Sequence, residues 1–286
     1  PPYMNTKTFA QQSRKILLKG VHDKLRYWGL DAKGQAAEEP QPVPGGYLFR
    51  GQPYDDPSVP ALWQSLRRAV QHKGLDTVAE EAAYTWFNRM MAIRILAKNG
   101  YDPAQLEFVE GAGRLPLILQ RAQRGAHPFL SAAEKARLQK VIADHTRETE
   151  AFAILLIGYC HHHTLLQTVF GSIDDYTELL LPDDILAEEG FLHLLNTTDA
   201  ISDDDYRKVE LIGWLYQFYI SEKKDEVFAG FKKNKKAEAA DIPAATQIFT
   251  PNWIVKYMVQ NTVGKIWLDL HPDSPLKANM KYLVEA

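Results

Sequence analysis

Cysteine, long apolar runs and an excess of positive charge are all scarce in this chain, and each absence excludes a class of protein. The single cysteine, Cys160, cannot form an intramolecular disulfide and fits a reducing compartment. The most apolar run, residues 151–160, is about half as long as a bilayer requires, and no basic-then-apolar leader opens the chain. These features predict a cytoplasmic protein that does not contact a membrane.

A net charge of −3 excludes a uniformly basic nucleic-acid binder, although it leaves room for a local basic face. With 45% hydrophobic and 11% aromatic residues, the chain is not a disordered tail. Its 286 residues can bury the core of one large domain or of two smaller ones. No internal repeat is evident.

Apolar residues recur at helical spacing over much of the chain, which predicts a mainly α fold. The stripe that contains Trp86 and Phe87 predicts that both aromatics lie in the core. Residues 31–60, rich in proline and glycine, predict a long ordered loop with one short strand at residues 47–49. The predicted helices span residues 7–28, 61–99 with a break at Gly74, 115–124, 132–142 and 151–169, the last one central to the core.

Three adjacent histidines, His161, His162 and His163, lie in the last of these helices. Neighbouring positions on a helix point about 100° apart, so the three rings cannot converge on one ion. A second ligand four residues from His162 would be Gly158 or Leu166, and no CxxC or HExxH motif supplies others. The pattern predicts solvent-facing or core-satisfied histidines and no metal site.

Charge is segregated in the second half of the chain. Residues 172–205 hold many acids without a lysine or arginine, as either an acidic surface for a partner or metal or a set of helix N-caps. We favour caps, as at residues 182–184 and 202–205, and expect the segment to repel DNA. Lysines then dominate. Their last run, FKKNKK, predicts either a solvated linker or a loop that contacts phosphate.

The segment from residue 244 to residue 269 organises the interpretation of the rest. Thr250 is a good helix N-cap, and Pro251 suits the first helical position, whose N–H would be unpaired anyway. Apolar residues then recur as far as Trp267 and predict a buried amphipathic helix. The start of such a helix suits a carboxylate or phosphate, but the spacing alone favours an ordinary capped helix.

Three stretches resemble one family of enzymes. Residues 246–251 (TQIFTP), with the Trp-Ile-Val and Asn-Thr-Val-Gly that follow, resemble motif X of amino-directed DNA methyltransferases. Residues 211–220 resemble the helix that leads into this motif, and residues 83–94 resemble an N-terminal helix with the sequence WFNR. Together they resemble the PglX family, the adenine-specific methyltransferases of BREX phage-defence systems, and its type IIG restriction-enzyme relatives.

The resemblance implies that motif X opens the catalytic domain and that Phe249, Thr250 and Pro251 help to hold the methionine part of S-adenosylmethionine. The intact protein would then methylate the exocyclic amine of adenine. Residues 270–286 hold neither the glycine-rich turn nor the Asn/Asp-Pro-Pro-aromatic loop of such enzymes, so we expect this chain alone to be inactive, with weak or no cofactor binding. Residues 1–3 (PPY) lack a preceding Asn or Asp and are interpreted as a vector-derived remnant.

We therefore predict a mainly α chain in which residues 4–205 form a helical N-terminal domain. Residues 206–286 would hold a connector helix, the Lys-rich loop and the start of a truncated α/β methyltransferase domain. In this interpretation the chain is a non-catalytic scaffold for the remaining methyltransferase domain in phage defence. The predicted contacts to double-stranded DNA are Arg67, Arg68, Arg89, Lys232, Lys233, Lys235 and Lys236.

Two alternatives remain for the function. One is a helical module that binds other phage-defence proteins, with the acidic segment as its contact surface. The other is an independent enzyme built around the three histidines. This second alternative is disfavoured because the sequence shows neither paired catalytic carboxylates nor a nucleophile–base signature.

Overall fold

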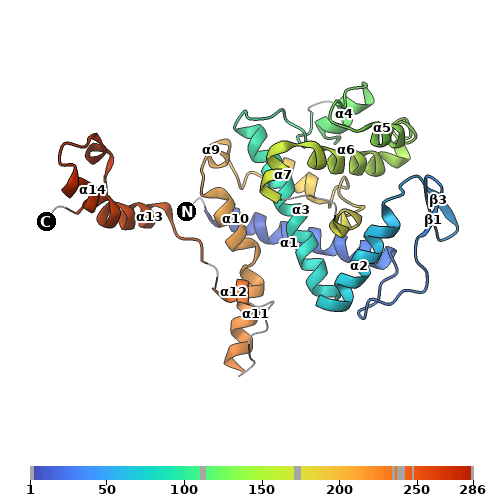
Figure 1. The fold of residues 1–286 in the computed structure, drawn as a ribbon, viewed down its shortest axis with the longest axis horizontal. Helices are drawn as coiled ribbons and strands as arrows, with labels where there is room; N and C mark the ends of the chain where they lie inside the picture. Colours follow the sequence, from blue (N-terminus) through green and yellow to red (C-terminus); the bar gives the residue numbers. More distant parts are fainter. Residues whose placement is uncertain are drawn as a thin grey trace. The chain divides into compact units, whose positions relative to one another are not determined.

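The computed structural model describes residues 3–109, 114–170, 175–233, 236, 242–246 and 248–284. They belong to two units, Pro1–Arg207 and Lys208–Ala286, each held together by its own contacts. Helices make up most of the described residues, and the described strands form one small sheet (Figure 1). The predicted mainly α fold is confirmed, whereas the predicted domain boundary after residue 205 stays a prediction about the intact protein.

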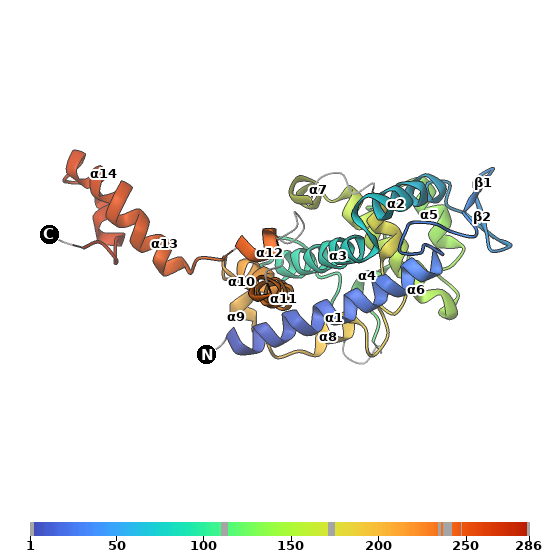
Figure 2. The ribbon, with the colours of Figure 1, turned by 90° about the horizontal axis from the view of Figure 1, so that it is seen from below.

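Two long helices form the centre of the first unit. Helix α1 (Tyr3–Tyr27) packs against α3 (Leu75–Lys98), which crosses it in Figure 1 and lies next to it in Figure 2. Each helix buries an apolar stripe at helical spacing, and Arg14 of α1 forms an ion pair with Glu80 of α3. The helices predicted here are confirmed, and so is the burial of Trp86 and Phe87. The buried stripes comprise Phe9, Leu17, Val21 and Leu25 on α1 and Val78, Ala82, Trp86, Met90 and Ile93 on α3.

Glycines mark both ends of α3. Helix α2 (Val59–Lys73) stops at Gly74, whose φ of 85° is one that residues with a Cβ rarely adopt. At the other end Asn99 is followed by Gly100, with φ of 73°. The predicted break at Gly74 and the predicted end at residue 99 are therefore confirmed.

The Pro- and Gly-rich segment between α1 and α2 contains a three-stranded antiparallel sheet in the order β1 (Gln41–Val43), β2 (Gly46–Phe49) and β3 (Gln52–Tyr54). Tyr47 and Phe49 of β2 are buried. The sequence predicts only this middle strand. The outer strands are three residues long and each carries a proline, so neither shows the alternation that identifies a strand.

The remaining helices of the first unit pack against α1, α2 and α3 and against one another. The predicted single helix over residues 151–169 is wrong in one respect, because it breaks at His163, whose backbone is extended (φ −86°, ψ 111°). The histidine ring there faces Asp102, with Nε2 3.3 Å from the carboxylate. These elements are α4 (Leu117–Gln123), α5 (Ala132–Gln139), η1 (His145–Arg147), α6 (Glu148–His162), α7 (Thr164–Phe170), η2 (Tyr176–Leu180), α8 (Phe191–Thr197) and α9 (Asp203–Tyr206).

The acids of residues 175–205 follow the capping prediction only in part. Ser202 and Asp205 form a reciprocal capping box at α9, with each side chain accepting the other's backbone N–H at 3.2 and 3.0 Å. Asp183 and Asp184 begin no helix, so the prediction is wrong at residues 182–184. They lie instead near lysines of α1, at 2.8 Å from Lys24 and 3.5 Å from Lys19. Residues 172–174 lie outside the described residues.

The second unit contains a run of helices and ends in an apolar one that is exposed, so the predicted burial of the helix over residues 254–267 is wrong for this unit. Side chains such as Val263, Ile266 and Trp267 are 44–69% exposed. Helical spacing dictates which residues share a face, but burial also needs a surface to pack against. The elements are α10 (Leu211–Tyr219), α11 (Ser221–Lys232), α12 (Ile242–Thr246), α13 (Asn252–Val259), the π-helical segment η4 (Gln260–Gly264), α14 (Lys265–Leu270) and η5 (Pro275–Asn279).

Candidate functional site

The segment expected to contact the cofactor lies at the start of α13. Phe249 is half-buried, with its ring 5.2 Å from the Trp214 indole, whereas Thr250 is exposed. Pro251, not Thr250, is the N-cap: its backbone is extended (φ −52°, ψ 139°) and its carbonyl accepts the N–H groups of residues 254 and 255. The helix thus begins one residue later than predicted. Thr250 directly precedes the N-cap, and its side chain is exposed.

A π-helical segment, η4, follows on the part of the chain that resembles the family's Asn-Thr-Val-Gly. Two of its side chains bind the backbone of the chain's last residues. Gln260 Oε1 accepts the N–H of Tyr282 at 2.7 Å, and Asn261 Oδ1 accepts the N–H of Val284 at 2.7 Å. Wider helical turns of this kind often occur at functional sites. Here the turn anchors the residues that come after α14.

The residues expected to contact DNA fall into two groups. Among the lysines, Lys232, Lys233 and Lys236 are exposed, and Lys235 lies outside the described residues. On α2, Arg68 is exposed and donates to Ser65 Oγ at 3.2 Å. Arg67 already has partners in its own unit, since its guanidinium donates to the Gly34 carbonyl and lies 3.6 Å from Glu39.

Arg89 is the exception, because it is only 2% exposed. Its guanidinium lies 5.1 Å from the Trp86 ring, and burial lowers its pKa despite the nearby negative charges of Asp175 and Glu178. A phosphate cannot reach this group in the structure. The predicted DNA contact at Arg89 is therefore wrong, and the reason is that residue 89 faces the core side of α3.

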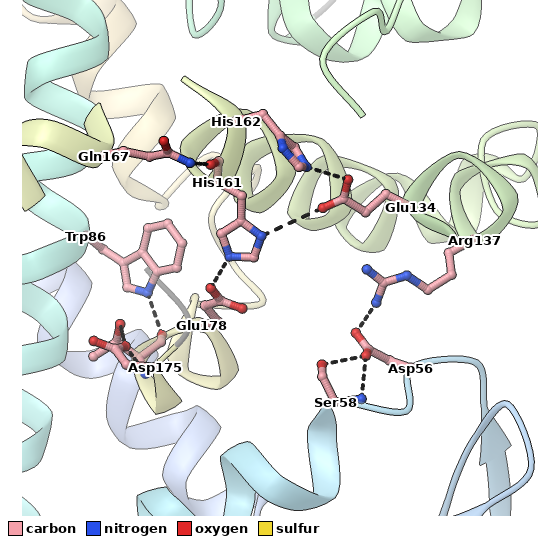
Figure 3. Close-up of polar contacts among 11 residues, drawn as sticks. Asp56, Ser58, Trp86, Glu134, Arg137, His161, His162, Gln167, Asp175 and Glu178 are labelled. Atoms are coloured by element: carbon pink, nitrogen blue, oxygen red, sulfur yellow. Dashed lines mark hydrogen bonds and ion pairs between the residues drawn. The ribbon is translucent and has the colours of Figure 1, made fainter. Parts of the chain in front are cut away.

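A second candidate is a histidine–carboxylate cluster in the first unit (Figure 3). His161 Nε2 hydrogen-bonds to Glu178, and its Nδ1 lies 3.7 Å from Glu134. His162 Nε2 lies 3.0 Å from Glu134 as well. Burial raises the pKa of Glu134, but hydrogen bonds from Ser131 and His162 outweigh burial and leave that pKa below its ordinary value. Both predicted environments occur: His161 is half-buried and His162 is exposed, and each ring has a carboxylate partner.

This cluster lies beside a cavity of about 250 Å³, which adjoins a second one of about 480 Å³. Tyr47 and Tyr54 line both cavities and stack with ring centroids 4.8 Å apart. The positively charged side chains that line the cavities form ion pairs with carboxylates of the same unit: Arg137 with Asp56, Arg147 with Glu150, and Lys24 with Asp183. Because these charges are already paired, the cavity is explained as part of the unit's internal structure.

The sequence shows one part of this cluster and misses the other. Ser131 and Glu134 form a capping box at α5, with reciprocal hydrogen bonds of 2.7 and 3.3 Å, and this spacing is readable in the sequence. Glu178 lies 17 residues from His161, and no local pattern joins the two. Within the described residues, no group of three or more potential ligands is arranged to hold a metal ion. None of the described helices is both long and apolar enough to span a bilayer.

Comparison with known proteins shows which proteins this chain is related to. No family model matches the chain. The chain is 38% identical, over 98% of its length, to the adenine-specific methyltransferase BrxX of Escherichia coli O9:H4 (strain HS). It is 33% identical, over 92% of its length, to the adenine-specific methyltransferase PglX of Lacticaseibacillus casei (strain Zhang).

These matches define the class: the chain is a homologue of proteins named adenine-specific methyltransferases. In particular, it is related to one region of the BREX proteins BrxX and PglX, since it spans 23% of the length of each. The resemblance predicted from the three sequence stretches is thereby confirmed.

Proposed function

We propose that this chain is the N-terminal part of an adenine-specific DNA methyltransferase that acts in phage defence in the cytoplasm. In the intact protein it serves as a non-catalytic scaffold for the catalytic domain and supplies the first contact to S-adenosylmethionine. Similarity over 98% of the chain to a protein named adenine-specific methyltransferase carries this proposal. The exposed apolar side chains of α13 and α14 support it, because such a surface suits a partner domain.

The first test is transfer of labelled methyl groups from S-adenosylmethionine to unmethylated bacterial DNA. We expect activity from the intact protein and none from the 286-residue chain. A mixture of the chain with the missing part, expressed separately, would test whether the chain acts as a scaffold. Methyl transfer by the 286-residue chain alone would contradict the scaffold role.

Thr250→Ala in the intact protein is expected to weaken the affinity for S-adenosylmethionine by about 10- to 100-fold. This range corresponds to the loss of one hydrogen bond to a charged group. Isothermal titration with S-adenosylmethionine measures the effect directly. Thr168→Ala is the matched control, since Thr168 is also exposed but lies on α7 of the first unit. An unchanged affinity in Thr250→Ala would remove Thr250 from the cofactor site.

The same proposal places double-stranded DNA on the exposed cations, Arg68 and the Lys-rich segment, with Arg67 as a weaker contributor because it is paired. Binding of other defence proteins through the acidic segment has less support. Several of those acids form ion pairs with cations of the same unit: Asp183 with Lys24, Asp203 with Lys98 and Glu188 with Arg114. An acidic surface that is neutralised internally attracts a basic partner weakly.

A further inference from the structure

One face of α10 receives the four residues 249–252, the FTPN segment, within the second unit. The backbone N–H of Phe249 donates to Gln217 Oε1 at 3.0 Å. Three residues later, the N–H of Asn252 donates to Glu210 Oε1 at 3.1 Å. The two acceptors are seven positions apart, which is about two helical turns, so they lie on the same side of the helix.

Between these two hydrogen bonds, the same face of α10 holds the aromatic ring of the segment. Gly213 and Trp214 are three and four positions after Glu210, so they complete the face. The Phe249 ring packs edge-on against the Trp214 indole, at an interplanar angle of 66°. A Cβ at position 213 would overlap the Phe249 ring, so glycine at this position leaves the space that the ring occupies.

The FTPN segment is thus held at both ends by backbone hydrogen bonds, and its first residue, Phe249, is also held by an aromatic contact. Thr250 is the residue of the segment that stays exposed. A loop fixed in this way presents its free side chain in one direction, and the ligand does not have to order the loop on binding.

We propose that this face of α10 is a positioning element for the cofactor-contacting loop, with Gln217, Glu210 and Gly213 as positioning residues. The proposal rests on the proposed function, because it assumes that Thr250 contacts S-adenosylmethionine. The residues of α10 act through the FTPN segment and do not touch the cofactor themselves. Their effect is therefore on cofactor affinity, not on the chemical step.

The test uses methylation kinetics of the intact protein with Gln217→Leu, Gln217→Glu and Gly213→Ala. Gln217→Leu removes the acceptor and is expected to raise KM for S-adenosylmethionine about tenfold, with kcat at saturating cofactor and KM for DNA little changed. Gln217→Glu keeps an acceptor oxygen and is expected to recover most of the loss. Gly213→Ala is expected to raise the same KM at least as much. Ile212→Ala, on an exposed position of α10, is the matched control.

A second measurement does not depend on activity. In the 286-residue chain, Gln217→Leu is expected to speed hydrogen exchange at the Phe249 amide, while Ile212→Ala leaves it unchanged. Faster exchange without a rise in KM for S-adenosylmethionine would overturn the positioning role. An equal rise in KM for cofactor and DNA, together with a lower thermal midpoint, would also overturn it and indicate general destabilisation.

Failure of this inference can be told apart from failure of the proposed function. If Thr250→Ala weakens cofactor binding and Gln217→Leu does not, the cofactor site stands and the positioning role is wrong. If Thr250→Ala has no effect on cofactor affinity, the assigned cofactor contact and the positioning role fall together.

Discussion

Trp86→Ala is expected to lower the free energy of unfolding of this chain by about 3–5 kcal/mol, the usual cost of deleting a large buried aromatic side chain. Trp86 is fully buried on α3, and its Nε1–H donates to the Thr177 carbonyl at 2.9 Å. The substitution therefore opens a cavity and also leaves a buried carbonyl without its donor. It removes the ring that faces the Arg89 guanidinium as well, so that buried charge loses a favourable neighbour.

Urea unfolding followed by circular dichroism measures this effect, and the slope of the transition shows whether the denatured state has changed. Trp253→Ala is the matched control, because Trp253 is 57% exposed and its removal should change stability by no more than about 0.5 kcal/mol. A loss below about 1 kcal/mol for Trp86→Ala would mean that the core around α3 can collapse onto the missing ring.

The helices of the first unit could be predicted because their apolar spacing agrees with their packing. On α3 the residues that repeat at helical spacing, such as Val78, Ala82 and Trp86, are the residues that become buried. Gly74 and Gly100, both at positive φ, lie before and after this helix and limit the pattern. Where a tertiary contact decides the structure, the pattern fails. His163 leaves the helix to face Asp102, a residue far earlier in the chain.

For the candidate site, too, local features could be predicted and long-range contacts could not. The FTPN segment is local, so its place at the start of a helix could be read from Thr250 and Pro251 to within one residue. Its contacts with Glu210 and Gln217 span 42 and 32 residues and leave no local trace. For Arg89 the prediction from the sequence was wrong, because it assumed that the side chain is exposed. A charge is normally exposed, and only the packing of α3 reveals that this one is 2% exposed.

The Lys-rich segment is where we expect the largest effect on DNA binding. Replacing Lys232, Lys233, Lys235 and Lys236 by glutamine removes four positive charges, of which the three described ones are exposed. Each lysine that contacts a phosphate releases about one counterion, so the plot of log affinity against log salt should become less steep by up to about four. At low salt the affinity of the intact protein for double-stranded DNA should fall by roughly two orders of magnitude or more, at about 1 kcal/mol per contact.

Fluorescence anisotropy with a labelled duplex, measured from about 50 to 200 mM salt, separates this effect from others. The matched control replaces Lys7, Lys33, Lys265 and Lys281, four exposed lysines outside the segment, and so changes the net charge by the same amount. If both sets weaken binding equally, DNA responds to the net charge and the segment is not a contact site. If neither set changes the salt dependence, the FKKNKK run is a solvated linker. A change confined to the segment identifies it as the phosphate-contacting loop.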